Sequence, residues 1–288
     1  AGIDILGENS LADYAVNPIV NITTILLIIL SGIGFMVWFD IIENTKELIH
    51  REVPGRWWFT RLRLHSKLAV IMTLALIAAG TLFVFAAEYH NPETIGKMSL
   101  GEKLMASVFQ SVTTRTAGFY TVSQGALHEE SKLFCSILMF IGGSPGGTAG
   151  GVKTTTFAML FLACLTFVRG GNDTECMGRR ISVANFRTGF CVVMVAFAAF
   201  VTGMIAILVI EPDSIPLVNI LYEAASAVGT VGLSADLTPQ LSRASQAVLM
   251  IMMYIGRLGP LTLVLTFAGK SHPRDRIRRL PKEQIMVG

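Results

Sequence analysis

Charged residues are scarce in this chain. Asp, Glu, Lys and Arg together make up 15% of its 288 residues, against about 25% in soluble domains. The apolar share is 52% and the mean hydropathy is +0.59. This balance excludes an ordinary soluble domain and indicates a polytopic membrane protein.

Cysteine and histidine are also few, and neither is arranged as a metal site. The cysteines form no Cys-x-x-Cys pair, which is typical of buried thiols rather than ligands or disulfides; they are Cys135, Cys164, Cys176 and Cys191. All histidines fall in predicted loops. The apolar core lacks paired carboxylates and any Ser-His arrangement, so we predict that the chain is not an enzyme. No nucleic-acid motif is present, and we expect no cofactor on this chain.

Several apolar runs are long enough to cross about 30 Å of hydrocarbon. They are 22–39, 68–87, 189–210 and 246–268. A further run, 133–167, is interrupted by glycines, and its first part is too short to cross alone. The interruption must therefore lie within the membrane or within the protein.

Basic residues gather on one side of the predicted membrane. Of the 23 lysines and arginines, 16 fall in the segments 46–67, 169–187 and 270–282, which the positive-inside rule places in the cytoplasm. The opposite loops carry most of the acidic residues, and this acidic mouth would concentrate cations. We therefore predict a multi-pass protein of the cytoplasmic membrane whose basic loops and C-terminal tail contact anionic lipids on the cytoplasmic side.

Two stretches, 114 residues apart, share one design. A short segment, 103–113 or 219–227, is about half a membrane helix long and runs into a Thr-small-Gly-apolar sequence. Irregular backbone at membrane depth is tolerated only where protein buries it or it lines water, and its carbonyls can replace the hydration shell of K+. We interpret these stretches, and a matching stub at the start of the chain, as an outward-facing ion filter of Ala1, Gly2, Ile3, Thr116, Ala117, Gly118, Phe119, Gly229, Thr230, Val231, Gly232 and Leu233.

The interruption in the run 133–167 contains six glycines and a proline in ten residues. This composition excludes a regular helix, so we expect the helix to break below the filter. The freed backbone groups could be satisfied by the hydroxyls of Ser144, Thr148 and residues 154–156. We interpret residues 142–153, the glycine loop, as a gate formed by Gly142, Gly143, Ser144, Gly146, Gly147, Thr148, Gly150, Gly151 and Lys153, together with Arg257. A phosphate-binding loop is disfavoured, because Val152 and not Gly precedes Lys153 and no strand precedes the loop.

Two arginines lie close to the predicted path. Arg115 directly precedes Thr116, and we expect it to turn behind the filter and bind a Glu or pore-helix carbonyls. Arg257 occupies the place in its repeat that Gly143 occupies in the other, so we expect it to face the path below the filter. There it could hydrogen-bond carbonyls of the glycine loop and raise the barrier to cations. The alternative, an arginine that only pins two helices together, stays open.

At these residues the chain resembles the superfamily of K+ transporters that includes the Trk, Ktr and HKT proteins, most closely the bacterial Ktr/Trk membrane subunit. The most specific marks are the sequences at 114–119, 141–153, 229–233 and 254–260. The resemblance implies an all-α membrane fold in which units of outer helix, pore helix, filter and inner helix surround one pore with pseudo-fourfold symmetry. About two and a half of the four units are present, so we expect a partial sequence.

The resemblance also implies function and partners. It implies K+ held by filter carbonyls, a homodimer of the membrane subunit, and a cytosolic ring of subunits that bind the regulatory nucleotide. Na+ stays open as a coupling or activating ion. The implied parts are 1–42 (end of repeat two), 43–67 (cytoplasmic linker), 68–168 (repeat three), 169–185 (cytoplasmic loop), 186–268 (repeat four) and 269–288 (basic tail).

The alternative function is a secondary transporter of another class, in which broken helices bind a small solute at the membrane midplane. Such carriers often contain inverted repeats. Here both predicted filters lie on the acidic side and both inner helices end on the basic side, so the repeats are parallel. We therefore predict K+ uptake through a gated filter.

Overall fold

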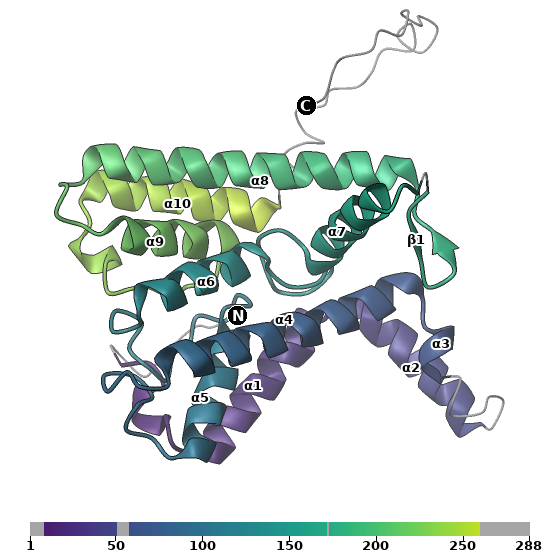
Figure 1. Cartoon of the computed structure of the whole chain (residues 1–288), viewed down its shortest axis with the longest axis horizontal. Helices are drawn as coiled ribbons and strands as arrows, with labels where there is room; N and C mark the ends of the chain where they lie inside the picture. Colours follow the sequence, from purple (N-terminus) through teal and green to yellow (C-terminus); the bar gives the residue numbers. More distant parts are fainter. Residues whose placement is uncertain (1–8, 51–57, 172, 260–288) are drawn as a thin grey trace, which may run out of the picture.

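The structure, a computed structural model, describes residues 9–50, 58–171 and 173–259, and these are mostly helical (Figure 1). The predicted filter stub Ala1, Gly2 and Ile3 lies outside the described residues. The elements are η1 (Ala12–Tyr14), α1 (Pro18–Gly32), α2 (Phe35–Ile49), α3 (Trp58–Arg61), α4 (Leu64–Glu88), α5 (Leu100–Thr113), α6 (Glu129–Phe140), α7 (Thr154–Val168), β1 (Glu175–Cys176), β2 (Arg179–Arg180), α8 (Val183–Ile210), α9 (Leu217–Gly229), η3 (Thr238–Gln240) and α10 (Arg243–Leu258).

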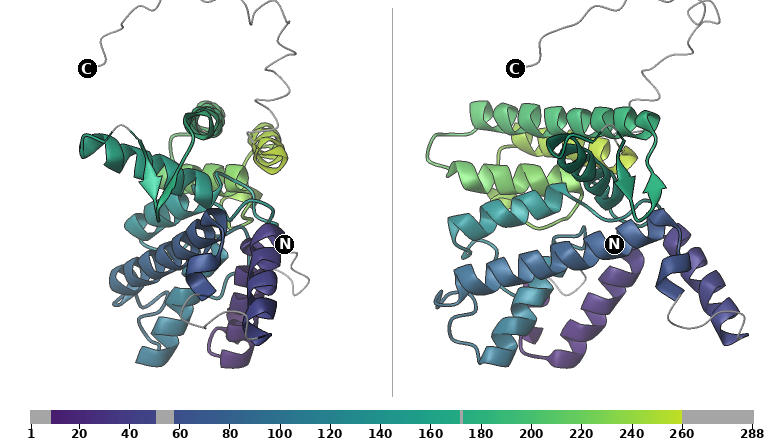
Figure 2. Two further views of the ribbon diagram at one scale, coloured as in Figure 1. Left: turned by 90° about the vertical axis from the view of Figure 1, so that its right-hand side faces the viewer. Right: turned by 45° about the vertical axis from the view of Figure 1, so that its right-hand side comes forward.

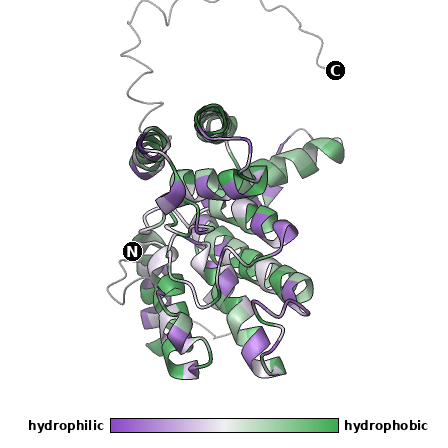
Figure 3. Ribbon diagram, turned by 90° about the vertical axis from the view of Figure 1, so that its left-hand side faces the viewer, coloured by the Kyte–Doolittle hydropathy of each residue, from purple (hydrophilic) through white to green (hydrophobic). Residues whose placement is uncertain are grey.

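Two helices of the described part, α4 and α8, are long and apolar enough to cross a membrane. They have 25 and 28 residues, and a 20-residue helix already spans about 30 Å. Large apolar side chains such as Phe190, Phe197 and Val209 are exposed along α8, and Figure 3 shows hydrophobic residues dominating the helices. Such faces suit contact with lipid.

The same order of elements occurs twice. Unit three, residues 64–168, consists of α4, α5, an irregular segment, and α6 with α7; unit four, residues 183–258, consists of α8, α9, an irregular segment, and α10. Figures 1 and 2 show α8, α9 and α10 side by side, with α6 lying between α9 and α4. The units share a core in which Val84 of α4, Met139 of α6 and Tyr222 of α9 pack together.

The two short helices begin slightly before their predicted starts. The capping box of Ser99 and Glu102, in which the Ser99 N–H donates to Glu102 Oε2 at 2.8 Å, starts α5 at Leu100. Helix α9 runs from Leu217 to Gly229 and ends at Thr230 in the left-handed conformation. Both helices end directly at the predicted filter residues.

The prediction that 22–39 forms one membrane-length run is wrong in its geometry. Helices α1 and α2 are bent by 95° at the break between Gly32 and Phe35. Gly34 has a φ of +92°, and a Cβ there would collide with the carbonyl oxygen of Pro145. The glycine loop packs directly against this bend.

Two smaller features also differ from the predicted all-α chain with a loop-like linker. A two-residue hairpin joins β1 and β2, with Glu175 opposite Arg180, within the predicted loop 169–185. Helix α2 reaches Ile49 and α4 begins at Leu64, so both ends of the predicted linker 43–67 are helical. The assignment of the units as repeats three and four of a fourfold assembly stays a prediction.

Candidate functional site

The two predicted filter segments, residues 116–119 and 229–233, have the same backbone pattern. Thr116 and Gly118 have φ values of +60° and +86°, and Thr230 and Gly232 have φ values of +50° and +95°. A positive φ at a β-branched residue is rare and costs about 1–3 kcal/mol. Because the strain recurs at both threonines, 114 residues apart, the irregular backbone is built into the fold twice.

The filter segments touch each other at their glycines. A Cβ on Gly118 would lie 2.6 Å from Val231 O and 3.3 Å from the Cα of Gly232, whereas a Cβ on Gly232 would meet only Gly118 Cα, at 3.5 Å. Glycine is therefore required at 118 for space and conformation, and at 232 mainly for conformation.

Side chains of the pore helices hold both segments. In unit three, Thr113 Oγ1 donates to Phe119 O. In unit four, Ser226 Oγ accepts the Gly232 N–H at 3.2 Å. Buried Glu223 holds the residues just beyond the segment, because it accepts hydrogen bonds from Thr238 Oγ1 at 2.7 Å and from the Ala235 N–H at 3.0 Å. Sequence reasoning missed Glu223, although an acidic residue on an apolar half-helix was a visible signal.

Arg115 is buried, with 7% of its surface exposed, and the partner expected for it is not found within the described residues. Its Nη2 has no hydrogen-bond partner, and across residues 9–50, 58–171 and 173–259 its guanidinium forms no bond to a Glu or a pore-helix carbonyl. Helix α5 carries Phe109 at the position where α9 carries Glu223.

The glycine loop breaks the helix at the predicted place and is closed at its neck. The Val152 N–H donates to Phe140 O at 3.1 Å, and the Thr154 N–H donates to Gly143 O at 3.0 Å. The Ser144 and Thr154 hydroxyls lie 3.0 Å apart within hydrogen-bond distance. These two hydroxyls bond each other, and the backbone groups at the neck are satisfied by backbone carbonyls rather than by the predicted hydroxyls.

The loop is anchored on the bend between α1 and α2. The Ser144 N–H donates to Gly32 O at 3.0 Å, and the Phe35 N–H donates to Gly146 O at 3.2 Å. A Cβ on Gly146 would lie 2.9 Å from the Phe35 ring. Sequence reasoning missed this contact, since nothing in the run 22–39 shows what faces its glycines.

The loop also lies directly beneath the filter of unit four. A Cβ on Gly150 would collide with Thr230 Oγ1 and lie 2.9 Å from Gly229 O. Thr230 Oγ1 and Thr116 Oγ1 are both buried without a hydrogen-bond partner within the described part of the chain. The loop therefore packs directly against the predicted filter segment 229–233.

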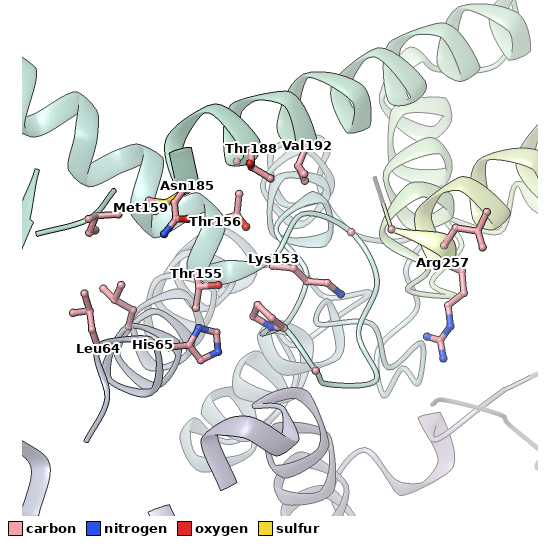
Figure 4. A pocket seen from close by; sticks show the side chains of 18 residues that line it. Leu64, His65, Lys153, Thr155, Thr156, Met159, Asn185, Thr188, Val192 and Arg257 are labelled. Atoms are coloured by element: carbon pink, nitrogen blue, oxygen red, sulfur yellow. The ribbon is translucent and has the colours of Figure 1, made fainter. Parts of the chain in front are cut away.

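Arg257 contacts the glycine loop as predicted. Its Nη1 donates to Thr148 O at 2.6 Å, and Lys153 Nζ donates to Ala149 O. Both side chains line a cavity of about 670 Å³ that also receives His65 of α4 and Asn185 of α8 (Figure 4). Two cationic groups beside the cavity oppose the entry of another cation.

The fold and these segments define a helical membrane protein in which a glycine loop packs against one of two similar, glycine-containing segments of strained backbone. A sequence model of the TrkH family, described as a cation transport protein, matches residues 1–280. The chain belongs to this family.

Named relatives agree with the family. The chain is 37% identical over 288 residues to the Ktr system potassium uptake protein B of Bacillus subtilis (strain 168), covering 100% of this chain and 61% of that protein. It is 34% identical over 290 residues to the potassium/sodium uptake protein NtpJ of Enterococcus hirae, with the same two coverages. The chain thus spans about three-fifths of the length of these relatives.

The crystal structure of the potassium transporter TrkH from Vibrio parahaemolyticus has a similar fold. The TM-score is 0.63 at 16% sequence identity, over 88% of this chain and 52% of that chain. At this identity the likeness establishes the fold alone.

Proposed function

We propose that the protein to which this chain belongs takes up K+ across the cytoplasmic membrane through a path lined by carbonyls of residues 116–119 and 229–233. The observation that carries the proposal is the repeated pair of positive φ values at Thr116 and Gly118 and at Thr230 and Gly232. A backbone strained in the same way at two equivalent places suits oxygen ligands that replace the hydration shell of a cation. The names of the relatives support K+ as that cation.

The pore helices add to the attraction for cations. Helix α5 ends at Thr113, close before the segment 116–119, and α9 ends at Gly229, the first residue of the segment 229–233. The C-terminal end of a helix carries a partial negative charge of about −0.5. Two such ends next to the filter favour a cation and disfavour an anion.

The glycine loop is the gate in this proposal, and the structure corresponds to its shut form. The loop is bonded to the α1–α2 bend through Ser144 and Phe35, and to α10 through Arg257. It covers the inner end of the filter at Gly150. Opening requires the loop to leave Thr230 and Arg257 while its neck bonds persist.

The remaining features of the proposal concern the assembly. The filters face outward and the basic loops face the cytoplasm, where they contact anionic lipids. The membrane subunit forms a homodimer that works with a cytosolic nucleotide-binding ring, and Na+ acts as a coupling or activating ion. Because this chain covers only about three-fifths of the length of its relatives, each of these properties has to be tested on the whole protein.

The test is uptake by cells that lack their own K+ uptake systems. The complete gene is expressed, and growth at low external K+ and influx of Rb+ are measured alongside influx of Na+. The proposal predicts rescue and Rb+ influx that excess K+ suppresses. Surface expression without Rb+ influx, in cells that also receive the regulatory subunit, would contradict it.

A further inference from the structure

Three buried polar side chains join the two units behind the filter segments. Gln110 belongs to pore helix α5, Gln124 follows the filter segment of unit three, and Tyr222 belongs to pore helix α9. Their exposed fractions are 2%, 1% and 0%. They lie apart from the predicted ion path and from the glycine loop.

The three side chains are joined by hydrogen bonds, and Gln110 Nε2 also contacts Cys135 Sγ of α6 at 3.8 Å. Gln110 Nε2 donates to Gln124 Oε1 at 2.7 Å, and Gln124 Nε2 donates back to Gln110 Oε1 at 3.0 Å. Tyr222 Oη donates to the same Gln124 Oε1 at 2.7 Å. Gln124 Nε2 also donates to Val122 O at 2.6 Å, which fixes the chain just beyond the filter.

The Tyr222 bond is the only one of the set that crosses between the units. Residues 124 and 222 are 98 positions apart in the sequence. The equivalent of Gln124 in unit four is Thr238, which binds Glu223 of its own unit. The segment after the unit-three filter is therefore tied to the neighbouring unit, whereas its counterpart is tied to its own pore helix.

This arrangement requires a specific geometry. A buried amide that loses a partner pays its desolvation penalty, so a satisfied polar network fixes the distance between the elements that carry it. The linked elements, α5 with residues 120–124 and α9, flank the place where Gly118 packs against Val231 O. The distance between α5 and α9 therefore determines the distance between the filter segments 116–119 and 229–233.

We propose that Tyr222, Gln124 and Gln110 are positioning residues that fix the spacing between the filter segments 116–119 and 229–233, and thereby determine which alkali cation the filter prefers. The inference rests on the proposed function. K+ and Na+ differ in size, so a filter whose walls can move relative to each other discriminates less between them. Selectivity is then lost before transport is lost.

The experiment measures the ratio of Rb+ to Na+ influx in cells that express the complete protein with Tyr222→Phe, which removes only the bridging hydroxyl. Because one hydrogen bond contributes about 1 kcal/mol, we expect the ratio to fall about fivefold. Tyr254→Phe is the matched control, since Tyr254 is exposed on α10, and its ratio should equal that of the wild type. An unchanged ratio in Tyr222→Phe, with total influx following the amount of protein in the membrane, would overturn the inference.

A double-mutant cycle separates positioning from general packing. Gln124→Met should lower the ratio at least as far as Tyr222→Phe, and the double variant should lower it no further, because the hydroxyl has already lost its acceptor. Additive effects would overturn the inference. The wild type is the reference for the function itself: absence of Rb+ influx there would overturn both proposals, whereas selective wild-type influx with an unaffected Tyr222→Phe would overturn only this one.

Discussion

Units three and four follow one order of elements but differ in the helix that follows the filter. In unit three the helix is broken into α6 and α7 by the glycine loop, whereas in unit four α10 continues unbroken from Arg243 to Leu258. Helix α10 keeps one glycine of the pattern, Gly256, where a Cβ would collide with Val228 O. A single glycine provides close approach to the filter, and only the cluster of six in residues 142–151 breaks the helix.

The difference divides the work between the units. In the proposed function the glycine loop is the part that moves, and Arg257 of α10 holds it through Thr148 O. A gate built this way needs one unit of each kind. The comparison leads to five experiments on the complete protein: three on influx, in order of decreasing effect, and two on stability.

The largest effect is expected at the filter glycines, and it should be unequal. Gly118→Ala meets Val231 O and a φ of +86°, whereas Gly232→Ala meets only the unfavourable φ of +95°. We expect a strain of about 2 kcal/mol in Gly118→Ala and of about 1 kcal/mol in Gly232→Ala. Rb+ influx should therefore fall about thirtyfold in Gly118→Ala and about fivefold in Gly232→Ala. Gly101→Ala, which has open space around it, is the control. Equal losses at 118 and 232 would break the comparison.

The glycine loop can be shortened without touching its neck. Deleting residues 145–149 keeps the bonds of Val152 to Phe140 O and of Thr154 to Gly143 O but removes the contacts with Gly146 and Thr148. If the loop is the barrier to the ion in unit three, the deletion should lower the activation free energy of passage by about 1.4 kcal/mol. Rb+ influx should then rise about tenfold. Lower influx from correctly folded protein would show that the loop is not a gate.

Arg257 should restrain influx from the side of unit four. Arg257→Gln removes a charge and the bond to Thr148 O, and loss of about 1 kcal/mol of barrier raises Rb+ influx about fivefold. Arg257→Lys keeps the charge, so its Rb+ influx should lie between that of the wild type and that of Arg257→Gln. Arg243→Gln, at the exposed start of α10, is the control and should leave influx unchanged. Loss of folding in Arg257→Gln without increased influx would instead assign Arg257 to packing.

The last effects are on stability rather than on influx, and they concern the starts of the helices that follow the predicted filter segments. Glu88 Oε1 accepts the N–H of His128 before α6 at 2.9 Å, and Glu211 Oε1 accepts the N–H of Ser242 before α10 at 2.9 Å. Glu88 is fully buried and also binds Asn91 and Thr94. Glu88→Gln should therefore destabilise the protein by about 2 kcal/mol, and Glu211→Gln should lower the Tm much less.

The Glu211 contribution should depend on pH. Hydrogen bonds from the side chains of Ser245 and Ser242 and from the Ser242 N–H hold the pKa of Glu211 below its usual range. A lowered pKa contributes stability above the unfolded-state value, and this stability is lost as the pH falls through the folded-state pKa. The Tm difference between wild type and Glu211→Gln, measured in detergent, should be present at pH 7 and shrink in acid. A difference that grows in acid would contradict the capping role.

Local composition predicted much of the fold. The glycines and proline of 142–151 predicted the break, and the short amphipathic segments before Gly118 and Gly232 predicted α5 and α9. The bend at Gly32–Phe35 was not predictable, because the apolar run 22–39 does not show that Pro145 packs against Gly34. The Tyr222–Gln124 bond and the missing partner of Arg115 were likewise hidden, since both depend on which elements the fold places side by side.

The most direct test of the account is to locate the transported ion. Crystals or frozen grids of the complete protein prepared in Tl+ or Rb+ should show ion density against the carbonyls of residues 116–119 and 229–233, and Gly118→Ala should remove it. Density bound elsewhere in the membrane region, with none between these two segments in protein that transports Rb+, would contradict the account.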